Sequence, residues 1–138
     1  MPAFDNPSNA DLCPMNQLLI LLAWIPLSMG FAQSPTGSLD AKAFKQDLDK
    51  ALLIDVRTPE EFAQGHIEGA ANINWLGGTL ISDVSGIDKT KPVLLYCGSG
   101  ERSGEAMAAL KQAGFTDIHD LKGGFEAWKA DGQPVITQ

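Results

Sequence analysis

A cysteine and an arginine that lie five positions apart are the residues of this chain best suited to chemistry. Cys97 and Arg102 enclose a short stretch of glycine and serine, and we call residues 97–103 the cysteine loop. Small residues allow several backbone N–H groups to turn toward one point, and Arg102 adds a full positive charge. Such surroundings favour the thiolate form of a cysteine. The sequence therefore predicts a nucleophilic Cys97 inside an anion-binding loop.

The segments on either side must position this loop. The short apolar run Val93–Tyr96 predicts a buried strand that leads directly into Cys97. Apolar residues at helical spacing predict a helix from Ser103 to about Ala113, ended by Gly114. The positive end of that helix would point at the sulfur. The alternative is a buried, unreactive cysteine beside an ordinary glycine turn, but the glycines, the arginine and the helix start favour an enzyme acting on a small anion.

The remaining segments alternate between strand and helix patterns. After a lead-in over residues 33–37, we expect a helix from Ser38 to about Lys50, a strand over 52–56, a helix from Pro59 to Gly65, a brief strand over 71–73, a loop-rich connection over 75–91 with a helical turn near Leu80, a strand over Ile118–Leu121 and a closing helix over 125–130. This alternation predicts one α/β domain with a mainly parallel sheet. Binding sites in such sheets lie at the carboxyl ends of the strands, where Cys97 is expected.

Several further segments, taken with the cysteine loop, resemble the rhodanese (sulfurtransferase) family. They are Leu53-Ile54-Asp55-Val56-Arg57, Pro59-Glu60-Glu61-Phe62, Gly65-His66-Ile67-Glu68-Gly69-Ala70, Asn72-Ile73 and Gly123-Gly124-Phe125-Glu126-Ala127-Trp128. The resemblance covers about residues 38–135 and is greatest to small, single-domain, exported (periplasmic) thiosulfate sulfurtransferases. It implies a rhodanese-like α/β fold, with a small parallel sheet flanked by helices on both faces.

The resemblance also implies a mechanism in two half-reactions. Cys97 takes the outer sulfur of thiosulfate as a persulfide, and cyanide or a thiol, including the thiol of a protein, then accepts that sulfur. No cofactor is implied, and two histidines with one mature cysteine give no metal spacing. The residues expected to bind the donor are Gly98, Ser99, Gly100, Glu101, Arg102 and Ser103.

Two other classes of function compete with this reading. Related phosphatases place the arginine six positions after the cysteine, whereas Arg102 follows Cys97 by five, which gives a smaller cradle suited to sulfur. An arsenate reductase with a disulfide relay would need a second mature cysteine. A non-enzymatic module that carries persulfide or binds a partner remains the alternative, although inactive domains of this type usually lack the cysteine.

Glu101 departs from the family's usual pattern, in which this position is often neutral or basic. A carboxylate beside an anion site opposes an incoming anion unless it points outward. We expect Glu101 to weaken thiosulfate affinity or to tune which donor is used, while its backbone N–H still contributes to the cradle.

Composition limits the partners. The 138 residues carry a net charge of −7 and contain no basic run, which argues against nucleic acid or an anionic membrane surface as the partner. The composition, 44% hydrophobic and 20% charged, is that of a globular protein. Anion binding must therefore be local to the cysteine loop.

The first 32 residues predict a secretory signal peptide, cleaved after Ala32, which leaves residues 33–138 as the mature domain in the periplasm or outside the cell. Residues 18–27 form an apolar run that is too short for a membrane span, so no stable membrane association is expected after cleavage; a retained anchor is the alternative. Met15 is a second candidate start, because the preceding stretch has no lysine or arginine. Cleavage would remove Cys13 and leave Cys97 unable to form an internal disulfide.

Three polar positions outside the loop are expected to be structural. Asp55 and Arg57 at a strand end suit an ion pair and a helix cap, and His66 suits a turn with a satisfied hydrogen bond. His119 has no supporting partner in the sequence. Trp75 either borders the site or packs in the core, and packing is the simpler expectation.

Overall fold

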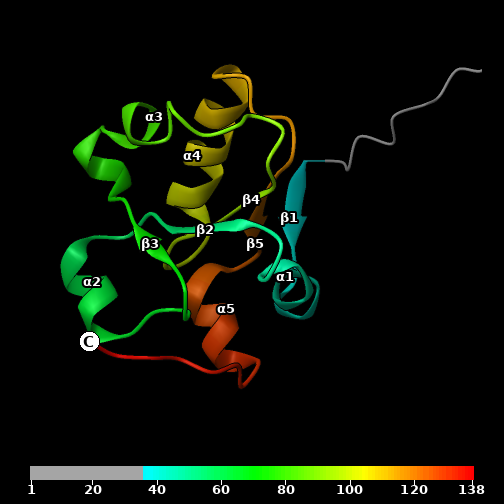
Figure 1. The fold of residues 1–138 in the computed structure, drawn as a ribbon. Coiled ribbons are helices and arrows are strands. Elements are labelled where there is room, and N and C mark those ends of the chain that lie inside the picture. Colours follow the sequence, from blue (N-terminus) through cyan, green and yellow to red (C-terminus); the bar gives the residue numbers. More distant parts are fainter. Residues whose placement is uncertain (1–35) are drawn as a thin grey trace, which may run out of the picture. The chain divides into compact units, whose positions relative to one another are not determined.

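The computed structural model describes residues 36–138, which form a five-stranded, wholly parallel sheet in the order β1-β5-β4-β2-β3 (Figure 1). Its elements are β1 (Gly37–Leu39), α1 (Ala41–Asp47), β2 (Leu52–Asp55), α2 (Pro59–Gln64), β3 (Ala71–Asn72), the 3-10 helix η1 (Trp75–Gly77), α3 (Leu80–Asp83), β4 (Val93–Tyr96), α4 (Glu101–Gln112), β5 (Ile118–Leu121) and α5 (Gly124–Ala130). The predicted signal peptide, Cys13 and Met15 lie outside the described residues.

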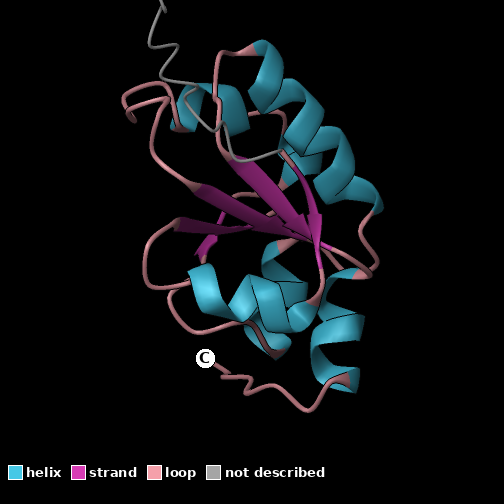
Figure 2. Ribbon diagram, turned by 90° about the vertical axis from the view of Figure 1, so that its right-hand side faces the viewer, coloured by secondary structure: helices cyan, strands magenta, loops and turns pink. Residues whose placement is uncertain are grey.

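Helices cover both faces of the sheet (Figure 2), which confirms the predicted fold class. One apolar cluster joins strand residues such as Leu95 to Leu80 of α3 and Leu110 of α4. The other joins Leu94 to Phe44 of α1 and Trp128 of α5, among others. Adjacent residues of β4 thus face opposite layers, as alternation along a strand requires. All four residues of this central strand are buried, so Cys97 follows the most enclosed segment of the fold.

Local signals set the ends of the helices near the site. The side chain of Thr58 accepts a hydrogen bond from the Glu61 N–H, and the Glu61 carboxylate accepts one from the Thr58 N–H. This reciprocal capping box, with Pro59 in the first turn, fixes where α2 begins. Asp40 caps α1 through its side chain alone, which accepts a hydrogen bond from the N–H of Ala43.

The first predicted helix was placed too early. Residues 37–39 form strand β1, and α1 begins only at Ala41 and ends at Asp47. β1 pairs in parallel with β5, whose partner residues lie more than 80 positions later in the chain; Ser38 is opposite Asp120. Three residues of this composition carry no local strand signal, and the distant partner decides their conformation.

Smaller differences concern the ends of elements. Helix α4 begins at Glu101 instead of Ser103, so two residues expected to precede the helix, Glu101 and Arg102, lie in its first turn. β3 ends at Asn72, and α5 begins at Gly124 after Gly123, which adopts a left-handed conformation with φ +75°. The connection after β3 holds both η1 and α3, where one helical turn was expected.

The ion pair expected of Asp55 and Arg57 and the hydrogen bond expected of His66 are present, but the helix cap expected of that pair is wrong, because Thr58 caps α2. The Arg57 guanidinium donates to both carboxylate oxygens of Asp55, the shortest distance being 2.6 Å, and both side chains are buried. His66 Nδ1 lies 2.9 Å from the Phe62 carbonyl oxygen. His119, for which the sequence offered no partner, has its Nε2 atom 3.2 Å from Asp117 Oδ1. Within residues 36–138, no helix is long and apolar enough to cross a membrane.

Candidate active site

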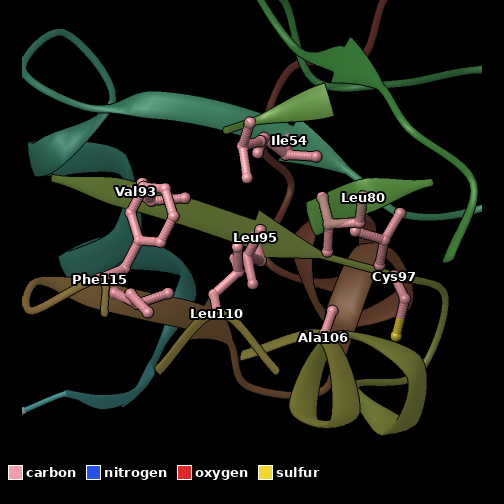
Figure 3. Close-up of a cluster of buried hydrophobic side chains, with 11 residues drawn as sticks. Ile54, Leu80, Val93, Leu95, Cys97, Ala106, Leu110 and Phe115 are labelled. Atoms are coloured by element: carbon pink, nitrogen blue, oxygen red, sulfur yellow. The ribbon is translucent and has the colours of Figure 1, made fainter. Parts of the chain in front are cut away.

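The sulfur of Cys97 lies at the carboxyl end of β4, where the chain leaves the sheet. Cys97 is fully buried and belongs to the apolar cluster beneath α4; Figure 3 shows its sulfur near Ala106. The Gly100 N–H donates a hydrogen bond to the Cys97 Sγ at 2.9 Å. The loop therefore supplies at least one backbone donor to the sulfur.

Helix α5 binds two carbonyl groups of the cysteine loop. The N–H of Phe125 donates to the Cys97 carbonyl oxygen at 2.7 Å, and the N–H of Glu126 donates to the Gly98 carbonyl oxygen at 3.1 Å. These donors belong to the first turn of α5, whose N–H groups have no partners within the helix. The backbone groups of two elements that are distant in sequence thus satisfy each other.

This contact requires a glycine at position 124. A Cβ atom on Gly124 would lie 2.5 Å from the Cys97 carbonyl oxygen and 2.6 Å from that of Gly98, and the residue has φ +64°. Both the close approach and the left-handed conformation exclude larger residues. Gly124 therefore allows the start of α5 to approach the backbone of the cysteine loop.

Arg102 is held by a carboxylate from another helix. Its two terminal nitrogens, Nη1 and Nη2, donate to the two carboxylate oxygens of Glu61 at 2.8 and 3.0 Å. Such a two-point pair fixes the plane of the guanidinium. The hydrogen bond from Arg102 is the main reason that the pKa of Glu61 is lowered to about 2, and the pKa of Arg102 is raised chiefly by the same contact. Gly98 lies against this pair, because a Cβ there would be 3.3 Å from Nη2.

The other predicted site residues divide into two groups. Glu101 and Ser99 are exposed, so the carboxylate of Glu101 lies on the outer side of the loop, the position in which it opposes an anion least. Ser103 is fully buried, with its hydroxyl oxygen 3.5 Å from the Cys97 Sγ. Gly100 occupies the N-cap of α4 with φ +102°.

A chain of polar side chains continues below the sulfur. Ser103 Oγ lies 3.1 Å from Asp120 Oδ2, and Ser38 Oγ donates to Asp120 Oδ1 at 2.5 Å. These residues come from α4, β5 and β1 respectively, and Asp120 is only 4% exposed. The structure thus places a buried carboxylate one hydroxyl away from the cysteine.

Sequence reasoning missed the roles of Glu61 and Asp120 in this arrangement. Glu61 was assigned only to the start of a helix, and its distance of 41 residues from Arg102 gave no local signal. Asp120 offered one, because a charged residue in the middle of a short buried strand, with Ile118 and Leu121 beside it, needs a partner. Trp75 packs against the cluster that contains Cys97, and its indole N–H donates to Glu105 at 2.9 Å.

Comparison with known proteins agrees with this geometry. Residues 40–131 match the rhodanese-like domain. The chain is 37% identical to a sulfurtransferase of Allochromatium vinosum over 102 residues. This alignment covers 72% of this chain and 94% of that protein. It is 45% identical to the uncharacterized protein YqhL of Bacillus subtilis over 91 residues, which are 66% of this chain and 71% of that protein. It is also 36% identical to the thiosulfate sulfurtransferase GlpE of Pseudomonas putida over 80 residues, which are 58% of this chain and 71% of that protein.

Solved structures give the same result for the fold. A rhodanese-related protein from Thermoplasma volcanium superposes with a TM-score of 0.66 at 29% identity, over 73% of this chain and 98% of that one. The relatives that are named sulfurtransferases support sulfur transfer as the general activity. On the domain match and on these relatives, the chain belongs to the rhodanese-like family.

Proposed function

We propose that this protein is a thiosulfate sulfurtransferase that carries the transferred sulfur on Cys97. The observation that supports this most directly is the arrangement around the sulfur, in which the Gly100 N–H points at Sγ while the loop carbonyls of Cys97 and Gly98 are bound by α5. A backbone N–H directed at the sulfur, with two of the loop's carbonyl oxygens bound by another helix, suits a bound anion. The relative that is named a thiosulfate sulfurtransferase supports thiosulfate as the donor.

The reaction proceeds through two sulfur transfers. The Cys97 thiolate attacks the outer sulfur of thiosulfate, a new S–S bond forms, and the bond to the sulfonate breaks so that sulfite leaves with the bonding electron pair. Cys97 is then a persulfide with an anionic outer sulfur. A nucleophile such as cyanide, or a cellular thiol, attacks that outer sulfur and restores the Cys97 thiolate. This is covalent catalysis of the ping-pong kind.

The remaining residues of the cysteine loop bind the donor and the persulfide. Backbone N–H groups over residues 98–103 stabilise the anionic outer sulfur, and Arg102, oriented by Glu61, presents its remaining N–H groups to thiosulfate. Glu101 at the outer edge reduces affinity for a doubly charged donor. Because Cys97 is fully buried, the acceptor must be small or must present a slender thiol.

The decisive experiment measures thiocyanate formed from thiosulfate and cyanide by the purified protein, with Cys97→Ser as the matched variant. We expect thiocyanate from the wild type and none from the variant. If neither protein forms thiocyanate while wild-type Cys97 still gains a sulfur atom, the protein is a persulfide carrier that needs another acceptor. If Cys97 gains no sulfur from any donor, the enzymatic proposal is wrong.

Export is part of the same proposal. Residues 1–32 act as a signal peptide, and the mature protein works in the periplasm or outside the cell, with small sulfur compounds or a thiol protein as partners. N-terminal sequencing of the protein recovered from the periplasmic or culture fraction should begin at Gln33. Recovery of a chain that begins at Met1 or Met15 from the cytoplasmic fraction would contradict export.

A further inference from the structure

Asp120 is a buried acid that the mechanism above does not use. It is 4% exposed, and the hydrogen bonds to its carboxylate come from two neutral hydroxyls, those of Ser38 and Ser103. Within residues 36–138, no lysine, arginine or histidine forms an ion pair with it. Burying an acid among neutral partners is costly, and such groups concentrate at functional sites.

Ser103 connects this acid to the sulfur. Its hydroxyl oxygen lies 3.5 Å from Cys97 Sγ, 3.1 Å from Asp120 Oδ2 and 3.2 Å from the Gly100 carbonyl oxygen. The hydroxyl has one proton to donate, and an ionised Asp120 and a carbonyl are both acceptors. The Ser103 proton therefore points away from the sulfur, and the Cys97 thiol donates its own proton to Ser103.

We propose that Asp120 accepts the proton of Cys97 through the Ser103 hydroxyl when the cysteine is activated. The S–H bond of Cys97 breaks, and its proton bonds to Ser103 Oγ. The former hydroxyl proton of Ser103 passes at the same time to Asp120 Oδ2. The sulfur keeps the electron pair and becomes the thiolate, and no atom or electron leaves the three side chains. The inference rests on the proposed role of Cys97 as the nucleophile.

The transfer suits a buried site because it moves a negative charge without creating a second one. Before the transfer the charge lies on Asp120, and afterwards it lies on Cys97, where the Gly100 N–H and the start of α4 stabilise it. A buried pair that carried both charges at once would be far less favourable. Asp120 does not touch the sulfur, so it is a positioning residue that acts through Ser103.

Within residues 36–138, no other ionisable side chain forms a hydrogen bond with Ser103 or Asp120. Over the same range, the Asp120 side chain is hydrogen-bonded by Ser38 of β1 and Ser103 of α4. On β5, the neighbouring His119 is paired with Asp117. Arg102 on α4 is bound to Glu61, and the remaining acids of the first turns of α4, Glu101 and Glu105, are exposed.

The test measures the rate at which iodoacetamide alkylates Cys97 across a range of pH. Asp120→Asn keeps an oxygen that accepts hydrogen bonds from Ser38 and Ser103 but cannot take up the proton. Near neutral pH we expect this variant to react roughly 10-fold to 100-fold more slowly than the wild type, with its pH profile shifted to higher pH. Ser103→Ala removes the hydroxyl between Cys97 and Asp120 and should slow alkylation by the same factor. The double variant should react no more slowly than either single variant.

Asp88→Asn is the matched control. Asp88 is an exposed acid that also accepts two hydrogen bonds, from the N–H and hydroxyl of Thr90, and this variant should react like the wild type. An unchanged or faster reaction of Asp120→Asn would overturn the proposal, because the carboxylate would then only repel the thiolate. If Asp120→Asn does not fold, Ser103→Ala is sufficient to test the proposal, because an alkylation rate equal to or faster than that of the wild type would overturn it.

This experiment separates the two proposals. Alkylation needs neither a sulfur donor nor an acceptor, so the pH profiles report on Asp120 even in a protein that transfers no sulfur. Conversely, a wild type that forms thiocyanate while Asp120→Asn alkylates at the wild-type rate would keep the proposed function and remove the proton path.

Discussion

At the scale of single residues, the pair between Glu61 and Arg102 joins the cap of one helix to the site at the start of another. Glu61 accepts hydrogen bonds from the Thr58 N–H and from both terminal nitrogens of Arg102. One carboxylate therefore sets both where α2 begins and how the guanidinium is presented. Exposed pairs are worth little, but here the pair also fixes a functional group, so we expect its loss to affect activity more than stability.

The Glu61→Gln variant tests this pair through the dependence of stability on pH. The pKa of Glu61 is lowered from 4.5 to about 2 in the folded protein, so the carboxylate stabilises the fold at pH values above about 4.5. That stabilisation is lost as the pH falls from about 4.5 through about 2. Urea unfolding of the wild type should show this decline, and Glu61→Gln should flatten it, with a loss of about 1 kcal/mol or less at neutral pH.

The control for this measurement is Glu60→Gln. Glu60 is the exposed neighbour in the same helical turn, and its replacement should leave the slope in this pH range as it is in the wild type. Equal slopes for the wild type and Glu61→Gln would show that the pair with Arg102 does not stabilise the folded state.

At the scale of elements, the site depends on the contact between the cysteine loop and helix α5. The sequence predicted the strand Val93–Tyr96, the loop and the helix after it, because their signals are local. It did not predict β1, the pair between Glu61 and Arg102, or the hydrogen bonds that link Cys97 to Asp120 through Ser103. Each of these joins residues that lie far apart in the sequence or are separated by a helix turn. Local patterns determine which elements form; their packing determines which side chains meet.

Gly124→Ala tests the contact between the loop and α5. A Cβ atom would lie 2.5 Å from the Cys97 carbonyl oxygen, at a residue with φ +64°, so either the loop or α5 must move. We expect a loss of about 2–5 kcal/mol in the free energy of unfolding and sulfur transfer that falls with it. Thermal unfolding and the thiocyanate assay measure the two effects.

Gly86→Ala is the matched control for that variant. A Cβ atom at Gly86 would meet nothing within 4 Å, and its φ is negative or extended. It should keep wild-type activity and stability to within about 0.5 kcal/mol. A fully active Gly124→Ala protein would show that the hydrogen bonds from Phe125 and Glu126 do not fix the loop.

At the scale of the whole molecule, the charge of the protein opposes its proposed donor. The chain carries −7, and because Asp5 and Asp11 are the only charged residues among the first 32, residues 33–138 carry −5. A negative field lowers the rate at which an anion such as thiosulfate reaches the site. Only the cysteine loop, with its N–H groups, Arg102 and the start of α4, attracts it at short range.

This balance predicts how salt affects the first half-reaction. The screening length falls from about 30 Å at 0.01 M salt to about 8 Å at 0.15 M, which removes long-range repulsion but leaves contacts inside the loop. The second-order rate of sulfur uptake from thiosulfate should therefore rise roughly twofold to tenfold over this range. Alkylation by iodoacetamide, a neutral reagent, should change little. A rate of sulfur uptake that falls with salt would mean that the loop's positive charge dominates at long range.

The central claim is that Cys97 itself carries the sulfur, and intact-protein mass spectrometry after incubation with thiosulfate tests it most directly. The account predicts that the wild type gains one sulfur atom per chain, that peptide mapping places it on Cys97, and that cyanide removes it. Cys97→Ser should gain none. A wild type whose mass stays unchanged, or an added sulfur that persists in Cys97→Ser, would contradict the claim.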